Sequence, residues 1–412
     1  MSGPIEALVS HNHTTTTMIE RLPVEIFHMI FTMAFPPPEQ ICYIERARPQ
    51  RVVMQICHYW RRIAKSVPKL WSNIFIDAAQ SDLELVDYQV ELSGNSPLSV
   101  LLYAEDDNIS EDAVAFVLKH QHQIASLCLN GLQGLFTRFS GEITAHQFEE
   151  IHLHSTDWLD LHPDSHIDLP VAPRRVTLEI VPFEDVRIDW NNVSSLQITA
   201  DYVEGALPRF DLAGRLKKLD LLLDNWGPPD NPSIIVNSSI EELSVKGMCG
   251  AEIVMTTMSL PSLKILRINI VDITRFTERI WYFLQRCDLE VMDVQERWVW
   301  INDSLGTSAL ITLLDTTKKL RELIISEVSE RLLSKLVDVK WLPGLQRISL
   351  SAHFDCDDDP SDFFTYLDLI GRRQSLVLTL TLSFDEEATD LKLDVMDRIK
   401  KMRASGNNIF ID

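Results

Sequence analysis

Residues 216–221 read Leu-Lys-Lys-Leu-Asp-Leu, with apolar residues at the first, fourth and sixth places. Alternation over the last three places is typical of a short strand that buries one face. The same pattern returns at 240–245, 263–268, 320–325 and 345–350. Weaker copies begin at Trp71, Leu98, Ile124, Phe148, Pro173, Val193, Leu289 and Val377.

Consecutive copies begin 20 to 32 residues apart, by subtraction of their first positions, and most intervals are near 25. A period of this length with this local pattern is typical of leucine-rich repeats, in which each unit supplies one strand of a parallel sheet. The Asn or Cys that usually follows the strand is mostly absent, so the array resembles an irregular relative of that repeat. The alternative is a set of strands from an unrelated α/β or all-β fold, which the near-constant spacing disfavours.

Several connections between the strands have helical periodicity, namely 110–120, 274–286, 304–316, 329–336 and 362–371. One strand and one helix per unit predict a right-handed βα solenoid with parallel strands. The connections from about 156 to 261 are rich in Pro, Asp and Ser, and we expect them to be irregular. Residues 385–405 predict a helix that caps the last repeat.

The N-terminal part carries a different pattern. We expect a first helix with one apolar face, stopped by the prolines at 36–38, and a second helix from Val53 to Val67, stopped by Pro68. A short strand is expected from Trp71 to Asp77. The apolar face of the first helix consists of Pro23, Ile26, Phe27, Ile30, Phe31 and Ala34.

This segment resembles the F-box, the motif that binds the small Skp-family adaptor of cullin-based ubiquitin ligases. The likeness is carried by the opening Leu-Pro-Val-Glu-Ile at 22–26, by Ile-Cys-His-Tyr-Trp at 56–60 and by the closing Pro-Lys-Leu-Trp at 68–71. It looks like the F-box-like domains common in fungal proteins, although the stretch 35–50 is longer and more polar than usual. The resemblance implies that the adaptor interface, or the packing beneath it, includes Leu22, Pro23, Ile26, Ile30, Val53, Cys57 and Trp60. The alternative is that these residues are core positions of a helical cap.

Composition limits the classes of partner. The net charge of −22 opposes binding to nucleic acid or to anionic membranes, since affinity for phosphates comes mainly from Lys and Arg. The six cysteines are scattered without a C-x-x-C pair, which favours reduced thiols and a cytoplasmic or nuclear location. Residues 1–18 are polar and predict a disordered tail, and we see no apolar run long enough to span a membrane.

No motif predicts catalysis. The chain has no P-loop, no G-x-S-x-G and no dinucleotide fingerprint, so we expect neither an enzyme nor a cofactor. The acidic run 355–362 is typical of a solvated loop, because it lacks the Gly and Glu of a calcium loop. Five histidines gather around one repeat, but no cysteine or firm ligand spacing accompanies them, and we expect no metal site. They are His146, His152, His154, His162 and His166.

In such a repeat, the residues between the buried positions of each strand face away from the helices. Asp220, Arg267 and Asp293 occupy these places and are the expected contacts to a target. His154, Glu179, Lys246, Asn269 and Gln295 stand two residues further along their strands. The face is mixed and mostly neutral to acidic, and the alternative is that targets bind loops instead.

These observations predict an α/β chain with a tail at 1–18, an all-helical F-box-like domain at 19–77, a leucine-rich-repeat-like domain at 78–384 and a capping helix and tail at 385–412. The expected function is that of a substrate receptor in a cullin-type ubiquitin ligase, joined to the cullin through the Skp-family adaptor and to an unknown protein target. The alternatives are a repeat scaffold whose helices only cap the array and an enzyme, which would need a convergent polar pocket.

Overall fold

The computed structural model describes residues 22–34, 49–79, 83–106, 108–144, 148–156, 166–181, 186–200, 213–223, 235–247, 254, 257–270, 277–296, 303–326, 330–338, 340–354, 361–372, 376–384, 389–405 and 408–411. The chain is α/β and divides into two compact units, Met1–Asp189 and Trp190–Asp412. The division falls inside the segment expected to form one repeat domain. The stretches at 1–18, 35–48 and 355–360, together with His146 and His162, lie outside the described residues.

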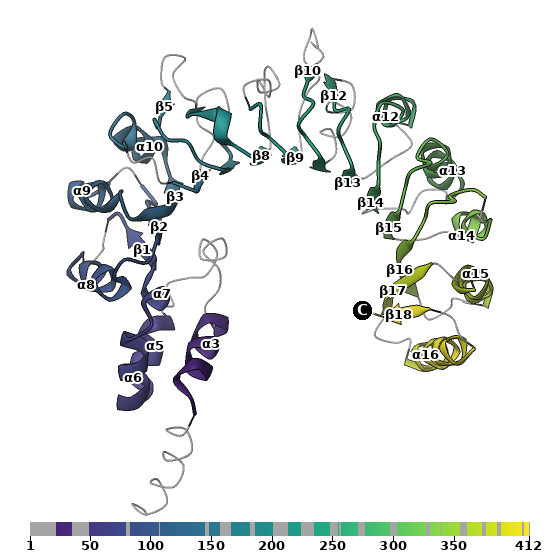
Figure 1. Ribbon diagram of the computed structural model, residues 1–412, viewed down its shortest axis with the longest axis horizontal. Coiled ribbons are helices and arrows are strands. Elements are labelled where there is room, and N and C mark those ends of the chain that lie inside the picture. The colour runs from purple at the N-terminus through teal and green to yellow at the C-terminus, as the bar shows by residue number, and fades with distance from the viewer. Residues whose placement is uncertain are drawn as a thin grey trace, which may run out of the picture. The chain divides into compact units, whose positions relative to one another are not determined.

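The first unit contains five parallel strands of the main sheet in sequence order. They are β1 (Asn73–Asp77), β2 (Leu98–Tyr103), β3 (Ile124–Gly131), β4 (Glu150–Ser155) and β6 (Arg175–Glu179). Helices α8 (Leu83–Ser93), α9 (Glu111–His120) and α10 (Gln133–Phe139) lie on one face of this sheet (Figure 1). A separate parallel pair is formed by β5 (Ile167–Asp168) and β7 (Val186–Arg187).

The second unit supplies the other nine of the 14 main-sheet strands in the described residues, again in sequence order. They are β8 (Ser195–Ala200), β9 (Lys218–Leu223), β11 (Glu242–Lys246), β13 (Ile265–Ile270), β14 (Val291–Glu296), β15 (Glu322–Ser326), β16 (Arg347–Phe354), β17 (Val377–Phe384) and β18 (Ile409–Ile411). A short pair, β10 (Ile235–Val236) and β12 (Met258–Ser259), and a 3-10 turn at Trp190–Asn192 lie in the connections.

Five helices lie on one face of the second unit's strands from β13 to β18, and the short pair β10 and β12 lies on the same side of the strands before them (Figure 1). The described residues place no helix on the other face. The five helices are α12 (Thr277–Leu284), α13 (Asp303–Leu314), α14 (Glu330–Leu336), α15 (Ser361–Gly371) and α16 (Thr389–Ala404). All five were predicted from periodicity. We refer to the uncovered side of the strands in each unit as the open face of that unit.

Two apolar positions per strand form the core on the side of the sheet opposite the open face. Leu219 on β9 is in register with Leu243 on β11, which is in register with Leu266 on β13. The second position lies two residues further along each strand, because alternate side chains share a face. The sequence predicts that ten of these residues are buried in line, and this is confirmed by exposures of 0–2 % at Leu219, Leu221, Leu243, Val245, Leu266, Ile268, Leu323, Ile325, Ile348 and Leu350.

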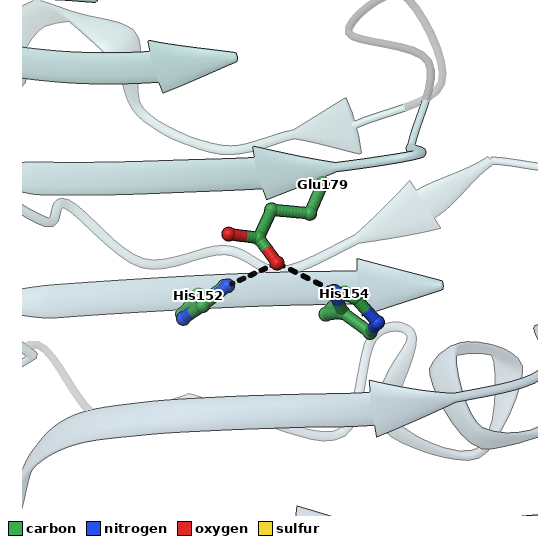
Figure 2. Close-up of side chains that lie close together, drawn as sticks. All are labelled: His152, His154 and Glu179. Atoms are coloured by element: carbon green, nitrogen blue, oxygen red, sulfur yellow. Dashed lines mark hydrogen bonds and ion pairs between the residues drawn. The ribbon is translucent and has the colours of Figure 1, made fainter. Parts of the chain in front are cut away.

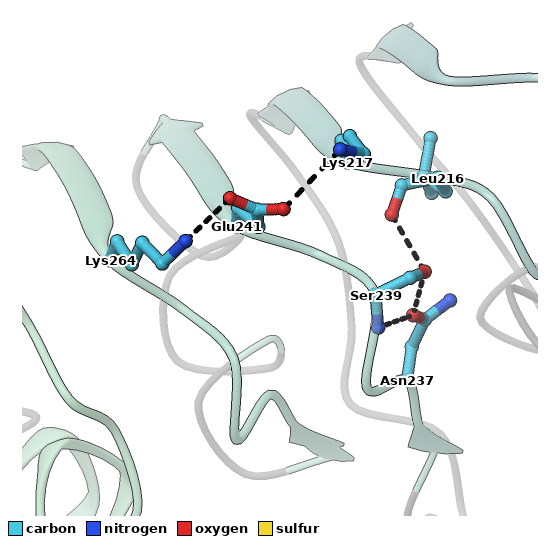
Figure 3. Close-up of polar contacts among 6 residues, drawn as sticks. All are labelled: Leu216, Lys217, Asn237, Ser239, Glu241 and Lys264. Carbon is cyan, nitrogen blue, oxygen red and sulfur yellow. Dashed lines mark hydrogen bonds and ion pairs between the residues drawn. The ribbon is translucent and has the colours of Figure 1, made fainter.

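A repeated backbone junction sets the start of each strand. The carbonyl of Lys217 accepts from the N–H groups of Glu241 and Glu242, and the carbonyl of Glu241 accepts in turn from Lys264 and Ile265. The side chains alternate in charge along this row: Glu241 lies 3.5 Å from Lys217 and 2.7 Å from Lys264 (Figure 3). Such exposed ion pairs contribute little stability each, so the backbone bonds are the stronger contacts of this junction.

The loop that leads into β11 is held from within. Asn237 Oδ1 accepts from the N–H of Ser239 at 2.9 Å and from its hydroxyl at 2.7 Å (Figure 3). The same hydroxyl lies 2.8 Å from the carbonyl of Leu216, on the preceding repeat. Asn237 is only 6 % exposed, so these contacts satisfy polar atoms that would otherwise be buried without partners.

In the described residues, four short helices precede β1: α3 (Val24–Ala34), α5 (Pro49–Ile56), α6 (His58–Lys65) and α7 (Pro68–Trp71). The expectation of one continuous second helix is wrong, because Cys57 is extended, with φ −158° and ψ 170°, and separates α5 from α6. Its thiol sulfur accepts from the N–H of Trp60 at 3.4 Å and so caps α6. Trp71 ends α7 rather than starting a strand, and Pro68 begins that helix, as suits its fixed φ.

Other sequence expectations were incomplete. Helices α8 and α10 were not foreseen. The expected C-terminal helix is described as α16 from Thr389 onward, and its first expected residues, 385–388, lie outside the described residues. The C-terminal residues expected to form a tail include β18, which pairs in parallel with β17. Val395 and Ile399 of α16 are buried, as a capping helix requires, but Leu393 is 67 % exposed. None of the helices in the described part of the chain combines the length and apolar content needed to cross a bilayer.

The stacked core yields a stability prediction. Leu243→Asp should destabilise the second unit by on the order of 4 kcal/mol, because Leu243 is 0 % exposed and the introduced carboxylate would lie among apolar neighbours. Lys246→Asp places the same residue at an exposed position of β11 and is the matched control. Hydrogen exchange of peptides covering β9 to β13 measures the effect, and equal protection in the two variants would contradict the stacked core.

Candidate functional site

Helix α3 has two apolar faces, only one of which is covered by described residues. Phe27 and Phe31, four residues apart, are 0 % and 1 % exposed. On the other side, Met29, Ile30 and Met33 are 52 %, 40 % and 80 % exposed. With Ile26, which is partly buried, they occupy positions i, i+3, i+4 and i+7 and therefore form one stripe. We call Ile26, Met29, Ile30 and Met33 the α3 stripe.

Further apolar exposure lies nearby in the sequence. Leu22, just before α3, is 40 % exposed, and Val52 and Ile56, one turn apart on α5, are 60 % and 53 % exposed. Seven of the thirteen most exposed large apolar residues of the described chain lie between 22 and 56. Single exposed apolar side chains are ordinary on a protein surface, but several exposed apolar side chains on neighbouring short helices are typical of an interaction site.

The covered face of α3 packs into an aromatic core. The Phe27 ring lies 5.6 Å from that of Tyr59 and 5.5 Å from that of Trp60, both edge-on, and the Phe31 ring lies 5.4 Å from that of Trp60. Val53, at 8 % exposure, belongs to the same cluster. This core fixes which side of α3 remains open.

The expected adaptor residues therefore fall into two groups. Leu22, Pro23 and Ile30 are exposed, and Ile26 is partly so. Val53, Cys57 and Trp60 instead build the packing and the cap beneath. Met29 and Met33 were not among the expected adaptor residues, because α3 is apolar on both sides and its pattern does not say which side is buried. The i, i+3, i+4, i+7 spacing of the α3 stripe was the available signal.

Helix α6 is basic in an otherwise acidic chain. It carries Arg61, Arg62 and Lys65, all exposed, and no acidic residue. The Arg62 guanidinium lies 5.3 Å from the Tyr59 ring, and the Lys65 ammonium lies 5.5 Å from the Tyr88 ring. The N-terminal helices thus present apolar and basic side chains, which fit a partner that is apolar at its centre and acidic at its rim.

The expected target residues lie in one row on the open face of the second unit. Asp220 on β9, Ser244 on β11, Arg267 on β13 and Asp293 on β14 are consecutive register partners. Arg267 contacts Glu242 in an ion pair and lies 4.0 Å from Asp293. The expectation that these residues lie on the same face of neighbouring strands is therefore confirmed.

Asp293 is unusual in this row because it is only 6 % exposed. Burial raises the pKa of its carboxyl above the ordinary value, while a hydrogen bond from Gln295 and the charge of Arg267 oppose that rise. Gln295 donates to Oδ2 at 3.5 Å, whereas Oδ1 makes no hydrogen bond to any described residue. Such a carboxylate opposes folding when it is ionised.

A second polar cluster lies on the open face of the first unit. His152 and His154 are two residues apart on β4, and Glu179 is the register partner of His154 on β6. Glu179 Oε2 lies 2.5 Å from His154 Nδ1 and 3.5 Å from His152 Nε2 (Figure 2). Hydrogen bonds from His152 and His154 lower the pKa of Glu179 to about 2, against desolvation. From the sequence, these histidines were expected to be surface residues. His154 and Glu179 were expected at equivalent positions of their strands, 25 residues apart, but no contact between them was predicted.

A scan against models of known protein families finds no match to this chain, and a search of curated proteins also finds none.

The buried carboxylate yields a prediction on pH. Because the folded-state pKa of Asp293 is raised, Asp293→Asn should stabilise the protein at pH 7, by on the order of 1 kcal/mol, the low end of the cost of a buried unpaired group. The gain should shrink as pH falls and should vanish below the unfolded-state value of about 3.9, where both states are protonated. Thermal unfolding at several pH values measures it. Asp220→Asn, at a less buried place in the row, is the control, and a gain that is independent of pH would contradict the assignment.

Proposed function

We propose that this chain is an F-box-like substrate receptor of a cullin-type ubiquitin ligase. In this account α3, α5 and α6 bind a Skp-family adaptor, and the open face of the strands binds a protein target. The proposal rests on the sequence resemblance at 22–26, 56–60 and 68–71 and on the exposure pattern of the helices. It implies a cytoplasmic or nuclear location.

The observation that carries the proposal is the α3 stripe. Met29 and Met33 expose more than half of their surface on a helix whose opposite side is already packed against Trp60. A helix that is apolar all round is normally buried, so a partner is expected to cover the stripe. Anchors at i, i+3, i+4 and i+7 are typical of a helix that lies in an apolar groove of another protein.

The same observation weighs against the rival scaffold, in which these helices only cap the array. A terminal cap protects the core of its neighbour and presents a polar outer face to water. Helix α3 has one charged residue, Glu25, and exposes an apolar stripe. An exposed apolar stripe is expected on a helix that binds a partner, and it is not expected on the outer face of a terminal cap.

The proposed mechanism is proximity rather than catalysis. The adaptor holds one end of the receptor near the cullin, and the target is held elsewhere on the chain. A charged ubiquitin-conjugating enzyme then acts on a lysine whose effective concentration is raised by tethering.

The target side of the proposal rests on the open face of the second unit. Asp220 and Arg267 are accessible there, and we propose them as contacts to a basic or neutral protein segment. Asp293 is too buried to steer a partner over distance, so its proposed role is a contact within the row.

The docking proposal predicts a specific loss of affinity. Met29→Asp combined with Met33→Asp should weaken binding of a purified Skp-family adaptor by about 2 kcal/mol or more, roughly 30-fold in Kd, because both anchors become charged. Leu22→Ala combined with Pro23→Ala should weaken it by a few kcal/mol. Calorimetric titration measures both effects. The melting temperature of the Met29/Met33 variant should stay near wild type, since both side chains are exposed without a partner.

Leu393→Asp is the matched control, since it places the same charge at an exposed apolar position of a helix in the second unit. It should leave adaptor affinity unchanged. If the wild-type chain does not bind the adaptor, the scaffold reading replaces the proposal. If it binds and the Met29/Met33 variant binds equally well, the α3 stripe is not the interface.

A further inference from the structure

The cluster of His152, His154 and Glu179 has the composition of a metal site. On β4, Ile151 and Leu153 are buried in the core, so the two histidines, at the alternate positions, project together onto the open face of the first unit. The ligand atoms of the three side chains all lie within 4.8 Å of one another. Their side-chain exposures are 16 %, 26 % and 13 %, so the groups are held by the sheet but remain reachable from solvent.

The geometry can be compared with that of zinc. Two ligands bound at 2.0–2.1 Å in a tetrahedral arrangement are about 3.3 Å apart. The separation of His152 Nε2 from Glu179 Oε2, 3.5 Å, already fits. The separation of His154 Nδ1 from the same oxygen, 2.5 Å, must open by about 1 Å, which a small side-chain rotation allows. The two rings are inclined at 82°, so their nitrogens approach the carboxylate from different directions (Figure 2).

The ligand types restrict the ion. Two imidazoles and one carboxylate suit borderline divalent transition metals, whereas calcium and magnesium prefer oxygen ligands alone. Three protein ligands leave one tetrahedral position for water or for a group from outside. We propose that His152, His154 and Glu179 bind one zinc ion on the open face of the first unit. This inference does not depend on the proposed ubiquitin-ligase function.

A neighbouring residue fits the role of an outer partner. Asn130 on β3 is the register partner of His154, on the side away from Glu179. It is 7 % exposed, and its Oδ1 makes no hydrogen bond to any described residue. Histidines that bind metal usually donate their second ring N–H to such an acceptor, which fixes the ring. We assign Asn130 this positioning role toward His154.

The test is calorimetric titration of the full-length, metal-stripped chain with Zn²⁺, followed by Co²⁺ substitution. The expected result is one ion per chain, with the visible absorption of tetrahedral Co²⁺. His152→Ala, His154→Ala and Glu179→Gln should each weaken binding by more than about 100-fold, and Asn130→Ala by roughly 10–100-fold. Glu179→Gln keeps the size of the side chain, so it still tests the contribution of Glu179 to zinc binding if the histidine variants do not fold.

Two controls separate this site from other histidines. His122→Ala removes an exposed histidine of the first unit, and the double change His11→Ala with His13→Ala removes another pair two residues apart in the sequence. Both should bind zinc as the wild type does. Zinc should also raise the melting temperature of the wild type but not that of Glu179→Gln. Absence of zinc binding, or binding that the Glu179 and His154 substitutions leave unchanged, would overturn the proposal and leave a histidine–carboxylate ion pair.

Discussion

Both units depend on the stacking of two apolar side chains per strand on the side of the sheet opposite the open face. Leu219, Leu243 and Leu266 show the arrangement: each lies in register with the next and is fully buried. Because side chains alternate across a strand, burial of these residues determines which residues face the other way. A shift of one residue in any strand would expose its leucines and bury its charges, so the core itself selects the register.

The functional surfaces follow from that register. It aligns Asp220, Arg267 and Asp293 across neighbouring strands of the second unit, and in the first unit it brings Glu179 beside His154. In each case the residues that become neighbours lie on different strands and far apart in the sequence. Each residue gains its neighbours because consecutive strands pair in parallel and in register. Polar clusters on the open faces are therefore a direct product of the apolar core behind them.

The α3 stripe obeys a different constraint. The aromatic core around Phe27 and Trp60 has room for one face of α3, so the second apolar face is left to water or to a partner. Exposed apolar surface of this kind favours self-association, which the net charge of −22 opposes. A partner that covers the stripe would remove this conflict between solubility and exposure.

Much of the fold could be predicted, because periodicity reports burial directly. The strand pattern located β9, β11, β13, β15 and β16, and the helical spacing located α9 and α12 to α15. The break at Cys57 could not be predicted, since it depends on a backbone conformation and a thiol cap rather than on hydrophobic pattern. Similarly, residue types alone give no rule for which of two apolar faces on α3 is buried. The contact of Glu179 with two histidines needed both the register and the side-chain positions.

Hydrogen–deuterium exchange of the full chain, with and without a Skp-family adaptor, tests the docking account most directly. The account predicts slower exchange on binding in peptides covering α3 and α5, with little change in the strands of the second unit. Protection confined to the strands, or none in α3 at saturating adaptor, would contradict it.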